Sequence, residues 1–241
     1  MSIKILHIIS GLNDGGAESA LYNFLCCSKN QIHYVISLKG PGKYGKLIEE
    51  RGIKAFYLNF SLNLSIVYDF IYLIKLIKSI KPDIVQTWLY HADLLGGCAA
   101  YLANSRNIFW GIHHTNLDKD FNKLSTILVA KINSFLSYLI PRKIIVCAES
   151  SKVIHMKKGY SKKKLITIPN GINTNKFKKS KKERSEFRKK INVKPHEFLY
   201  GTVARFHPIK DHVTLIKSIY KLKESGFKFK FLLIGKDINY K

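Results

Sequence analysis

The sequence alternates short apolar runs with segments of helical periodicity, and this alternation restricts the fold more than any other feature. Seven β-rich runs occupy residues 3–9, 34–38, 55–58, 84–88, 108–112, 144–147 and 165–168. Continuous apolar runs of this length are typical of strands buried on both faces of a sheet. Between the runs, apolar residues recur at helical spacing, as at Ala17, Leu21 and Leu25. Strands that alternate with helices form a parallel sheet, so we predict an α/β fold.

Two other helical segments differ in the surroundings that we expect for them. Residues 124–140 repeat apolar side chains at helical spacing, and we predict that this helix belongs to the core. Residues 67–80 mix apolar and basic side chains, so this helix is a candidate for contact with anionic lipid, although a solvated surface explains it equally.

The composition changes near residue 170, which indicates a domain boundary. Pro169-Asn170-Gly171 is a turn signal, and residues 171–197 that follow are rich in lysine and arginine. This segment predicts an exposed connection or a solvated helix, and it is a second candidate for lipid contact. Residues 198–241 then show a strand, a helix and a strand, a single βαβ unit that cannot close its own core. We expect a first domain at 1–170 and a second, truncated domain from 198; alternatively, this last segment extends the first sheet.

The chain carries a formal net charge of +25, from 41 basic and 16 acidic residues. Of the basic residues 35 are Lys and 6 are Arg, whereas nucleic-acid recognition favours the planar guanidinium group. We therefore predict no nucleic-acid partner. The lysine excess fits attraction to an anionic membrane surface, or it reflects codon usage alone.

The sequence shows no signal for export or for membrane insertion. Residues 1–10 hold too few apolar side chains for a signal-peptide core, and no window approaches the about 18 uninterrupted apolar residues of a spanning helix. The four cysteines form no CxxC pair and lie in apolar stretches, as free thiols do in a reducing compartment. We predict a cytoplasmic protein that is peripheral on the inner leaflet of the cytoplasmic membrane.

A glycine-rich turn follows the first predicted strand. Gly15 and Gly16 lie where the strand gives way to a helix, and such a turn presents free backbone N–H groups and a positive helix end to an anion. The spacing is not GxGxxG and no acidic residue follows the second strand, so we predict no dinucleotide cofactor. A tight turn without a ligand is the alternative.

Arg205 and Lys210 lie at a second crossover from strand to helix. Ligands of open parallel sheets bind at the carboxyl ends of strands, so we expect both cations to point into one crevice. Two cations beside a helix N-terminus can bind a diphosphate. Asp211 is expected to cap the helix, where it would compete with an anion. Solvated surface charge is the alternative explanation for the two cations.

Three histidines, His91, His113 and His114, lie at or just beyond the ends of predicted strands, at the edge where substrate would bind. A single histidine is more often a structural hydrogen-bonding group, so either role is open for each of the three. No HxxxH motif and no cluster of Cys and His indicates a metal site, and we predict none.

Together these motifs resemble those of family 4 of the retaining glycosyltransferases, which have the GT-B fold of two facing Rossmann-like domains. The matching segments occur in the family order at residues 15–18, 87–97, 110–116, 168–173 and 203–212. The variants His91-Ala92-Asp93-Leu94 and Lys210-Asp211-His212 are most similar to the branch that builds bacterial surface polysaccharides on lipid carriers. The resemblance implies a GT-B fold whose second domain is truncated in this chain.

The resemblance also assigns roles to residues. Arg205 and Lys210 would bind the diphosphate of a nucleotide sugar, with the turn 15–16 in the cleft opposite them. One of the three histidines would contact the transferred sugar or the acceptor, and Glu18 and Asn116 would lie on the acceptor side. The acceptor hydroxyl would attack from the side on which the diphosphate departs, with retention, so no protein nucleophile, metal or cofactor is required.

The expected function is transfer of a hexose or N-acetylhexosamine to a lipid-linked saccharide during synthesis of O-antigen, capsule or lipopolysaccharide. Two departures from the family pattern bear on it. Asn173 stands where the family usually has Asp, and the family's pair of glutamates spaced eight apart, which contacts the donor, would fall beyond Lys241. A nucleotide-sugar 2-epimerase of the same fold, or a non-catalytic fragment that binds acceptor or membrane, are the alternatives.

Overall fold

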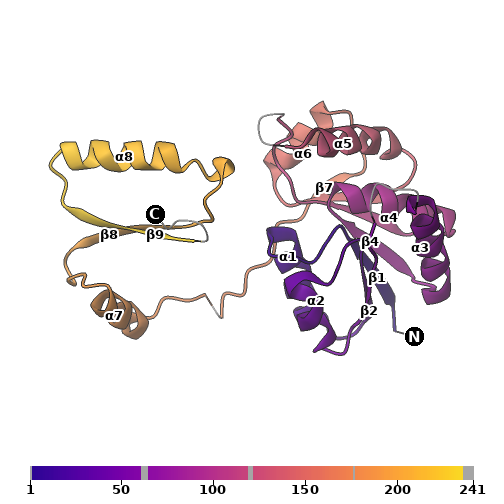
Figure 1. The fold of residues 1–241 in the computed structure, drawn as a ribbon, viewed down its shortest axis with the longest axis horizontal. Helices are drawn as coiled ribbons and strands as arrows, with labels where there is room; N and C mark the ends of the chain where they lie inside the picture. The colour runs from indigo at the N-terminus through magenta and orange to yellow at the C-terminus, as the bar shows by residue number, and fades with distance from the viewer. Residues whose placement is uncertain (1, 61–64, 119–121, 176, 236–241) are drawn as a thin grey trace. The chain divides into compact units, whose positions relative to one another are not determined.

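The computed structural model describes residues 2–60, 65–118, 122–175 and 177–235 (Figure 1). The chain divides into two compact units, residues 1–171 and 172–241. In the first unit strands and helices alternate, with these bounds: β1 (Lys4–Ile9), α1 (Gly16–Cys27), β2 (Ile32–Ser37), α2 (Gly42–Glu49), β3 (Lys54–Tyr57), α3 (Ile66–Ile80), β4 (Ile84–Trp88), α4 (Tyr90–Leu102), β5 (Ile108–Ile112), α5 (Leu124–Leu136), β6 (Lys143–Val146), α6 (Glu149–Lys157) and β7 (Leu165–Thr167).

The seven strands of the first unit form one parallel sheet in the order β3-β2-β1-β4-β5-β6-β7. Strand β1 lies inside the sheet, where Leu6 pairs with Tyr34 of β2 and with Val85 of β4. The strand order reverses between β1 and β4, and in open parallel sheets such a reversal opens a crevice at the carboxyl edge. The predicted parallel α/β sheet is confirmed, and each of the seven apolar runs supplies one of its strands.

The sheet is covered on both faces, which explains why its strands are continuously apolar. Ile8 belongs to the larger buried cluster, which includes Trp110, whereas the next residue, Ile9, belongs to a second cluster formed with α1 and α2. Figure 1 shows α1 and α2 on one side of the sheet and α3 and α4 on the other. Helix α4 lies close to the sheet because it has Gly96 and Gly97 there: a Cβ at these positions would lie 2.8 Å from Ile8 and 2.6 Å from Trp110 Nε1.

Helix α5 lies in the core only in part: Ala130 belongs to the larger buried cluster, and Val129 and Leu136 pack against it. Its buried residues are small or polar, namely Ala130, Asn133 and Ser134, and Asn133 Nδ2 donates to the carbonyl of Tyr90 at 2.8 Å. Other apolar side chains of the helix are exposed, as at Leu124, which is 74% exposed. The prediction holds for one face only, because helical periodicity identifies an apolar face but not the element that covers it. Small side chains face α4, and they allow the two helices to contact each other closely.

The second unit contains α7 (Lys181–Lys190), β8 (Phe198–Val203), a short 3-10 turn (Pro208–Lys210), α8 (His212–Glu224) and β9 (Phe229–Ile234). Strands β8 and β9 pair in parallel in a sheet of their own, so the alternative that they extend the first sheet is wrong. The basic segment forms α7 in part. The Ser180 hydroxyl caps this helix by accepting a hydrogen bond from Glu183 N at 3.2 Å.

Gly42, at the start of α2, has a backbone conformation that only glycine adopts without strain. Its φ is +52°, and a Cβ would overlap the carbonyl group of Leu12 and lie 2.6 Å from Asn13 N. We expect Gly42→Ala to lower the free energy of unfolding by about 1–3 kcal/mol, as urea denaturation would measure. Gly16→Ala is the matched control, since a Cβ there meets nothing within 4 Å. An equal loss in both variants would contradict the steric explanation.

Candidate functional site at the carboxyl edge of the sheet

The loops that follow β1, β2, β4 and β5 lie at the carboxyl edge of the first sheet and are tied to one another. Ser10, directly after β1, accepts a hydrogen bond on its hydroxyl from Ala92 N in the first turn of α4 at 3.2 Å. Leu12, further along the same loop, accepts through its carbonyl from Tyr44 N of α2 at 2.9 Å. The loop at the β1–β4 reversal is therefore held from both sides, which fixes the entrance of the crevice.

Leu89 joins β4 to α4 in a strained backbone conformation. Its φ of +74° and ψ of 152° belong to a region that is essentially reserved for glycine, although Leu89 N still donates to the carbonyl of Gly111 at 2.9 Å. Such strain persists only where the surrounding structure imposes it, and it gathers at functional sites. The two residues on either side, Trp88 and Tyr90, both contact histidines of the next loop.

His113 and His114 are anchored by these two aromatic rings. The His113 ring stacks on Trp88 at a centroid distance of 5.1 Å, and the His114 ring stacks on Tyr90 at 5.4 Å. Burial lowers the pKa of His113 to about 4 and also lowers the pKa of His114, so both rings are neutral near pH 7. The Nδ1 atom of each ring is buried without a hydrogen-bond partner among the described residues. A neutral imidazole with an unused nitrogen can bind a hydroxyl group.

His91, in the first turn of α4, completes the group of predicted histidines. Burial lowers its pKa, and the positive charge of Lys39 lowers it further. The charge of His91 in turn adds to the lowering of the His114 pKa, which burial causes in the main. Lys39 follows β2, and its side chain passes 3.8 Å from the position of a Cβ on Gly11. Sequence reasoning missed Lys39, because a single lysine outside a motif gives no signal in a lysine-rich chain.

The glycine turn before α1 carries a carboxylate in this structure. Gly15 is the N-cap of α1, and the Glu18 side chain folds back over it, so that a Cβ on Gly15 would lie 2.9 Å from Glu18 Cδ. Burial raises the pKa of Glu18, a backbone hydrogen bond opposes this, and Asp14 adds to the rise. An anionic ligand at Gly15 and Gly16 would have to displace this carboxylate.

Asn116, the other residue assigned to the acceptor side, is exposed in the loop after β5. Its Oδ1 accepts a hydrogen bond from Asp118 N at 2.6 Å, and its carbonyl accepts from Asn122 Nδ2 at 3.0 Å. These bonds hold the loop in a turn. The roles of Asn116 and of Glu18 in binding acceptor remain predictions.

Arg205 and Lys210 belong to the second unit, on the connection from β8 to α8. Both side chains are exposed, and neither has a hydrogen bond or ion pair to another described residue. Asp211 caps α8 as expected: its φ is +46° and its carboxylate accepts from Thr214 N at 3.2 Å. The assignment of the two cations to a donor diphosphate remains a prediction.

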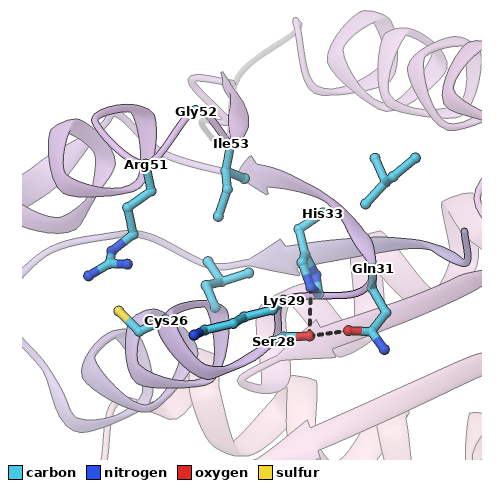
Figure 2. Close-up of a pocket in the computed structure, with 10 residues that line it drawn as sticks. Cys26, Ser28, Lys29, Gln31, His33, Arg51, Gly52 and Ile53 are labelled. Carbon is cyan, nitrogen blue, oxygen red and sulfur yellow. Dashed lines mark hydrogen bonds between the residues drawn. The ribbon is translucent and has the colours of Figure 1, made fainter.

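A directed hydrogen-bond chain supports the His113 side of the site. Trp88 Nε1 donates to His7 Nδ1 at 3.3 Å, so the hydrogen of the neutral His7 ring lies on Nε2 and points at His33 Nδ1, 3.1 Å away. His33 Nε2 then donates to the Ser28 hydroxyl at 2.9 Å, and this hydroxyl donates to Gln31 Oε1 at 2.6 Å, as Figure 2 shows. Complete burial lowers the pKa of His7 to about 3, which keeps the chain intact at neutral pH.

A second network supports the His114 side. His155 Nδ1 donates to the carbonyl of Ser151 at 2.7 Å, so its Nε2 accepts from the Tyr90 hydroxyl at 2.5 Å. The Ser151 hydroxyl donates to the carbonyl of His114 at 2.8 Å. Asp93, three residues after Tyr90 in α4, is completely buried, and its carboxylate accepts a hydrogen bond from the Thr87 hydroxyl. Burial raises the pKa of Asp93 well above the ordinary value. Sequence reasoning named His114 but missed the residues that position it.

A cavity of about 390 Å³ lies at the opposite, amino edge of the sheet (Figure 2). It is lined by the end of α1 and by the residues that lead into β2 and β3, among them Cys26, Lys29 and Arg51. It is therefore separate from the carboxyl-edge site, and it meets the hydrogen-bond chain at its far end, where Ser28, Gln31 and His33 line it. Among the described residues, no group of three His, Cys, Asp or Glu side chains is placed to hold a metal ion.

A doubly wound parallel sheet with polar groups at its reversal, followed by a separate βαβ unit, defines an α/β protein of the GT-B type. The sequence pattern of Glycosyltransferase Family 4 matches residues 14–176, more than half of the chain, and the chain belongs to that family. The match covers the glycine turn and the three histidines but not Arg205 or Lys210.

Similar proteins agree with this assignment. EpsF of Bacillus subtilis, named as a glycosyltransferase, is 25% identical over 96% of this chain and 62% of its own length. An Escherichia coli enzyme named UDP-Gal:alpha-D-GlcNAc-diphosphoundecaprenol alpha-1,3-galactosyltransferase is 24% identical over 87% of this chain and 55% of its own length. HepE of Anabaena, solved with UDP-glucose, is similar in fold, with a TM-score of 0.74 at 17% identity, over 97% of this chain and 69% of HepE. The chain thus spans less than two thirds of the length of these two curated relatives.

No helix within the described ranges is both long and apolar enough to cross a bilayer.

We predict that His113 makes the protein less stable in acid. Its folded pKa of about 4 lies below the ordinary value of 6.5, so the unfolded chain binds the proton first, and stability falls as the pH drops from about 6.5 towards 4. His113→Phe keeps a ring on Trp88 but cannot titrate. Urea denaturation should show the wild type losing about 2 kcal/mol relative to this variant between pH 6.5 and pH 5. Parallel curves for the two proteins would contradict the assignment.

Proposed function

We propose that the protein transfers a hexose or N-acetylhexosamine from a nucleotide diphosphate sugar to a lipid-linked saccharide, with retention of configuration, during synthesis of a bacterial surface polysaccharide. Membership of Glycosyltransferase Family 4 supports the reaction class. The name of the Escherichia coli relative, which includes a UDP sugar and a diphosphoundecaprenol acceptor, supports both substrate classes, and the HepE complex supports a uridine nucleotide donor.

The observation that carries this proposal is the group of neutral histidines at the β1–β4 reversal. His113 and His114 each keep an Nδ1 without a partner among the described residues, and His91 at the start of α4 and Lys39 after β2 lie at the same edge of the sheet. Sugars present hydroxyl groups and no charge, so neutral rings with unused hydrogen-bonding atoms suit them better than cationic rings would. We assign one of these histidines to contact with the transferred sugar or the acceptor.

In the second unit, Arg205 and Lys210 bind the donor diphosphate in this proposal. Negative charge builds on the diphosphate as the glycosidic bond breaks, so fixed cations stabilise the transition state more than the bound substrate. The acceptor hydroxyl attacks on the face from which the diphosphate departs, which gives retention without a protein nucleophile. The turn at Gly15 and Gly16 lies near the donor phosphates, Glu18 and Asn116 lie on the acceptor side, and no metal or cofactor takes part.

The acceptor's lipid determines where the protein works. A saccharide on a lipid carrier is confined to a membrane, so the protein is peripheral on the inner leaflet of the cytoplasmic membrane in this proposal. The formal charge of +25 supports this location, because the anionic lipids of that leaflet attract cationic surfaces.

Replacing either cation tests the donor assignment. In the full-length product of the gene, Arg205→Ala or Lys210→Ala should each reduce turnover of the nucleotide sugar by about a hundredfold, comparable to the loss of one oxyanion-stabilising donor. Lys221→Ala, which removes an exposed lysine from α8, is the matched control and should leave turnover unchanged. Normal turnover in both site variants would show that the two cations do not bind the diphosphate.

The stereochemical outcome tests the mechanism separately. A donor with an α-linked sugar should give an α-linked product, because attack and departure share one face. Nuclear magnetic resonance of the product, read from the coupling constant of its anomeric proton, distinguishes the two anomers. A β-linked product would overturn retention without affecting the assignment to a transferase.

A further inference from the structure

Helix α5 carries a continuous stripe of exposed apolar side chains. The stripe residues are between 39% and 74% exposed, and they are Leu124, Leu128, Ile132, Phe135 and Leu139. Their spacing of four, four and three residues places the first four on one face of the helix, and Leu139 lies in the turn that follows the helix. The helical part of the stripe, from Leu124 to Phe135, is about 16 Å long at the rise of an α-helix. Exposed apolar surface of this extent marks an interaction site more often than it marks ordinary surface.

The opposite face of α5 packs against the first unit, so the stripe is not the face that this helix buries in the core. Ala130 and Ser134 are buried there, and Asn133 is bonded to the carbonyl of Tyr90 in α4. A helix normally buries its apolar face and exposes its polar face. In α5 apolar side chains line the outward face as well as the inward one, which indicates that a second apolar environment meets the helix from outside.

A basic turn lies against the C-terminal end of the stripe. Residues 157–164 contain five lysines, at 157, 158, 162, 163 and 164. Ser161 N in this turn donates to the Ser137 hydroxyl at 2.9 Å, and Lys164 Nζ donates to the carbonyl of Tyr138 at 2.6 Å. These bonds hold the turn beside the last turn of the helix. We call the stripe and this turn together the α5 surface.

The charge around the α5 surface has one sign. Residues 122–164 contain ten Lys or Arg and a single acidic residue, Glu149. Glu149 is 3.9 Å from Lys152, which offsets its charge. Lys157, Lys158, Lys162 and Lys163 are exposed. An apolar stripe flanked by unopposed lysines is complementary to a surface that is apolar inside and anionic outside.

We propose that the α5 surface docks the protein on an anionic lipid bilayer. The stripe enters the boundary between headgroups and acyl chains, and the lysines of the basic turn contact lipid phosphates. The inference rests on the proposed function in one respect, which is that a lipid-linked acceptor requires the protein to reach a membrane. It adds the element that makes the contact.

Charge favours lipid over a second copy of this chain. The α5 surface of a second copy offers the lysines of the basic turn almost no acidic partner, because residues 122–164 contain ten basic residues and only one acidic residue. Charge also favours α5 over α3, which was predicted to contact lipid. Val67 and Tyr68 are exposed at the start of α3, but the acidic Asp69 lies in the same turn. The α5 stripe contains no acidic residue.

The position of α5 suits an acceptor on a lipid. The helix begins directly after the loop that carries His113 and His114, at the carboxyl edge of the sheet. A protein docked along α5 holds this edge near the headgroups, where the saccharide of a lipid-linked acceptor lies. The first residue of the stripe, Leu124, is the part nearest in sequence to the histidines.

Vesicle co-sedimentation of the 241-residue chain tests the proposal without any sugar substrate. The chain should bind vesicles of phosphatidylglycerol and phosphatidylcholine, and the double variant Leu128→Glu with Phe135→Glu should bind at least about tenfold more weakly. Tyr68→Glu on α3, as exposed as Leu124, is the matched control and should bind like the wild type.

Lysine substitutions test the electrostatic part of the proposal, which is the contact of the basic turn with lipid phosphates. Lys162→Ala with Lys163→Ala should weaken binding to the anionic vesicles by about fivefold per lysine. Lys75→Ala with Lys78→Ala removes the same charge from α3 and should have little effect. Far-ultraviolet circular dichroism verifies folding, and Phe135→Ser provides a milder variant should the double glutamate variant fail to fold.

Several outcomes would overturn the inference. Binding to anionic vesicles that survives the α5 substitutions would place the contact elsewhere, and absence of binding by the wild type would remove it. A dimer in sedimentation equilibrium that is lost in the α5 variants, with vesicle binding retained, would assign the stripe to a second copy. A full-length wild type that turns over nucleotide sugar without binding vesicles would refute only this inference, whereas a full-length wild type that binds vesicles through α5 without any turnover would refute only the proposed function.

Discussion

The geometry of the candidate site depends on a single backbone residue, Leu89. Its positive φ lies between Trp88, which belongs to the buried cluster on one face of the sheet, and Tyr90, which belongs to the cluster on the other. Each aromatic ring then stacks on one of the two adjacent histidines, His113 and His114. Because of this strain, the two neighbouring imidazoles stack on rings that belong to opposite faces of the sheet. In a regular strand, residues 88 and 90 would point to the same face.

Burial also decides the charge state of the site. The protein carries a large excess of positive charge, yet the histidines at the carboxyl edge are held neutral, since desolvation lowers the pKa of each. The cationic group found at this edge is instead a lysine, Lys39, in the loop after β2. Hydrogen-bonding groups and charged groups are therefore separate side chains here.

Sequence reasoning succeeded where a sequence pattern corresponds to a single kind of structure. The seven apolar runs could only be strands with both faces covered, and the turn after residue 169 separates the two units. For α5 it predicted only the inward face correctly, because an apolar face looks the same in a sequence whether protein or another medium covers it. It also missed the strain at Leu89, since no residue pattern announces a positive φ at leucine, and it missed Lys39 among many lysines. The three histidines were predicted from strand ends, but the rings that hold them were not.

The hydrogen-bond chain from Trp88 to Gln31 has one consequence for the molecule as a whole. Every hydrogen in it points the same way, from the carboxyl edge to the amino edge. The reason is that the Trp88 indole N–H at one end can only donate, and the Gln31 amide oxygen at the other end can only accept. No single hydrogen bond of this chain can therefore exchange its donor and acceptor without a change in the others. Ser28, on the rim of the cavity in Figure 2, is therefore linked through this chain to Trp88, on which the His113 ring stacks. The carboxyl and amino edges of the sheet are thus joined by one continuous hydrogen-bond chain, whose direction is fixed at both of its ends.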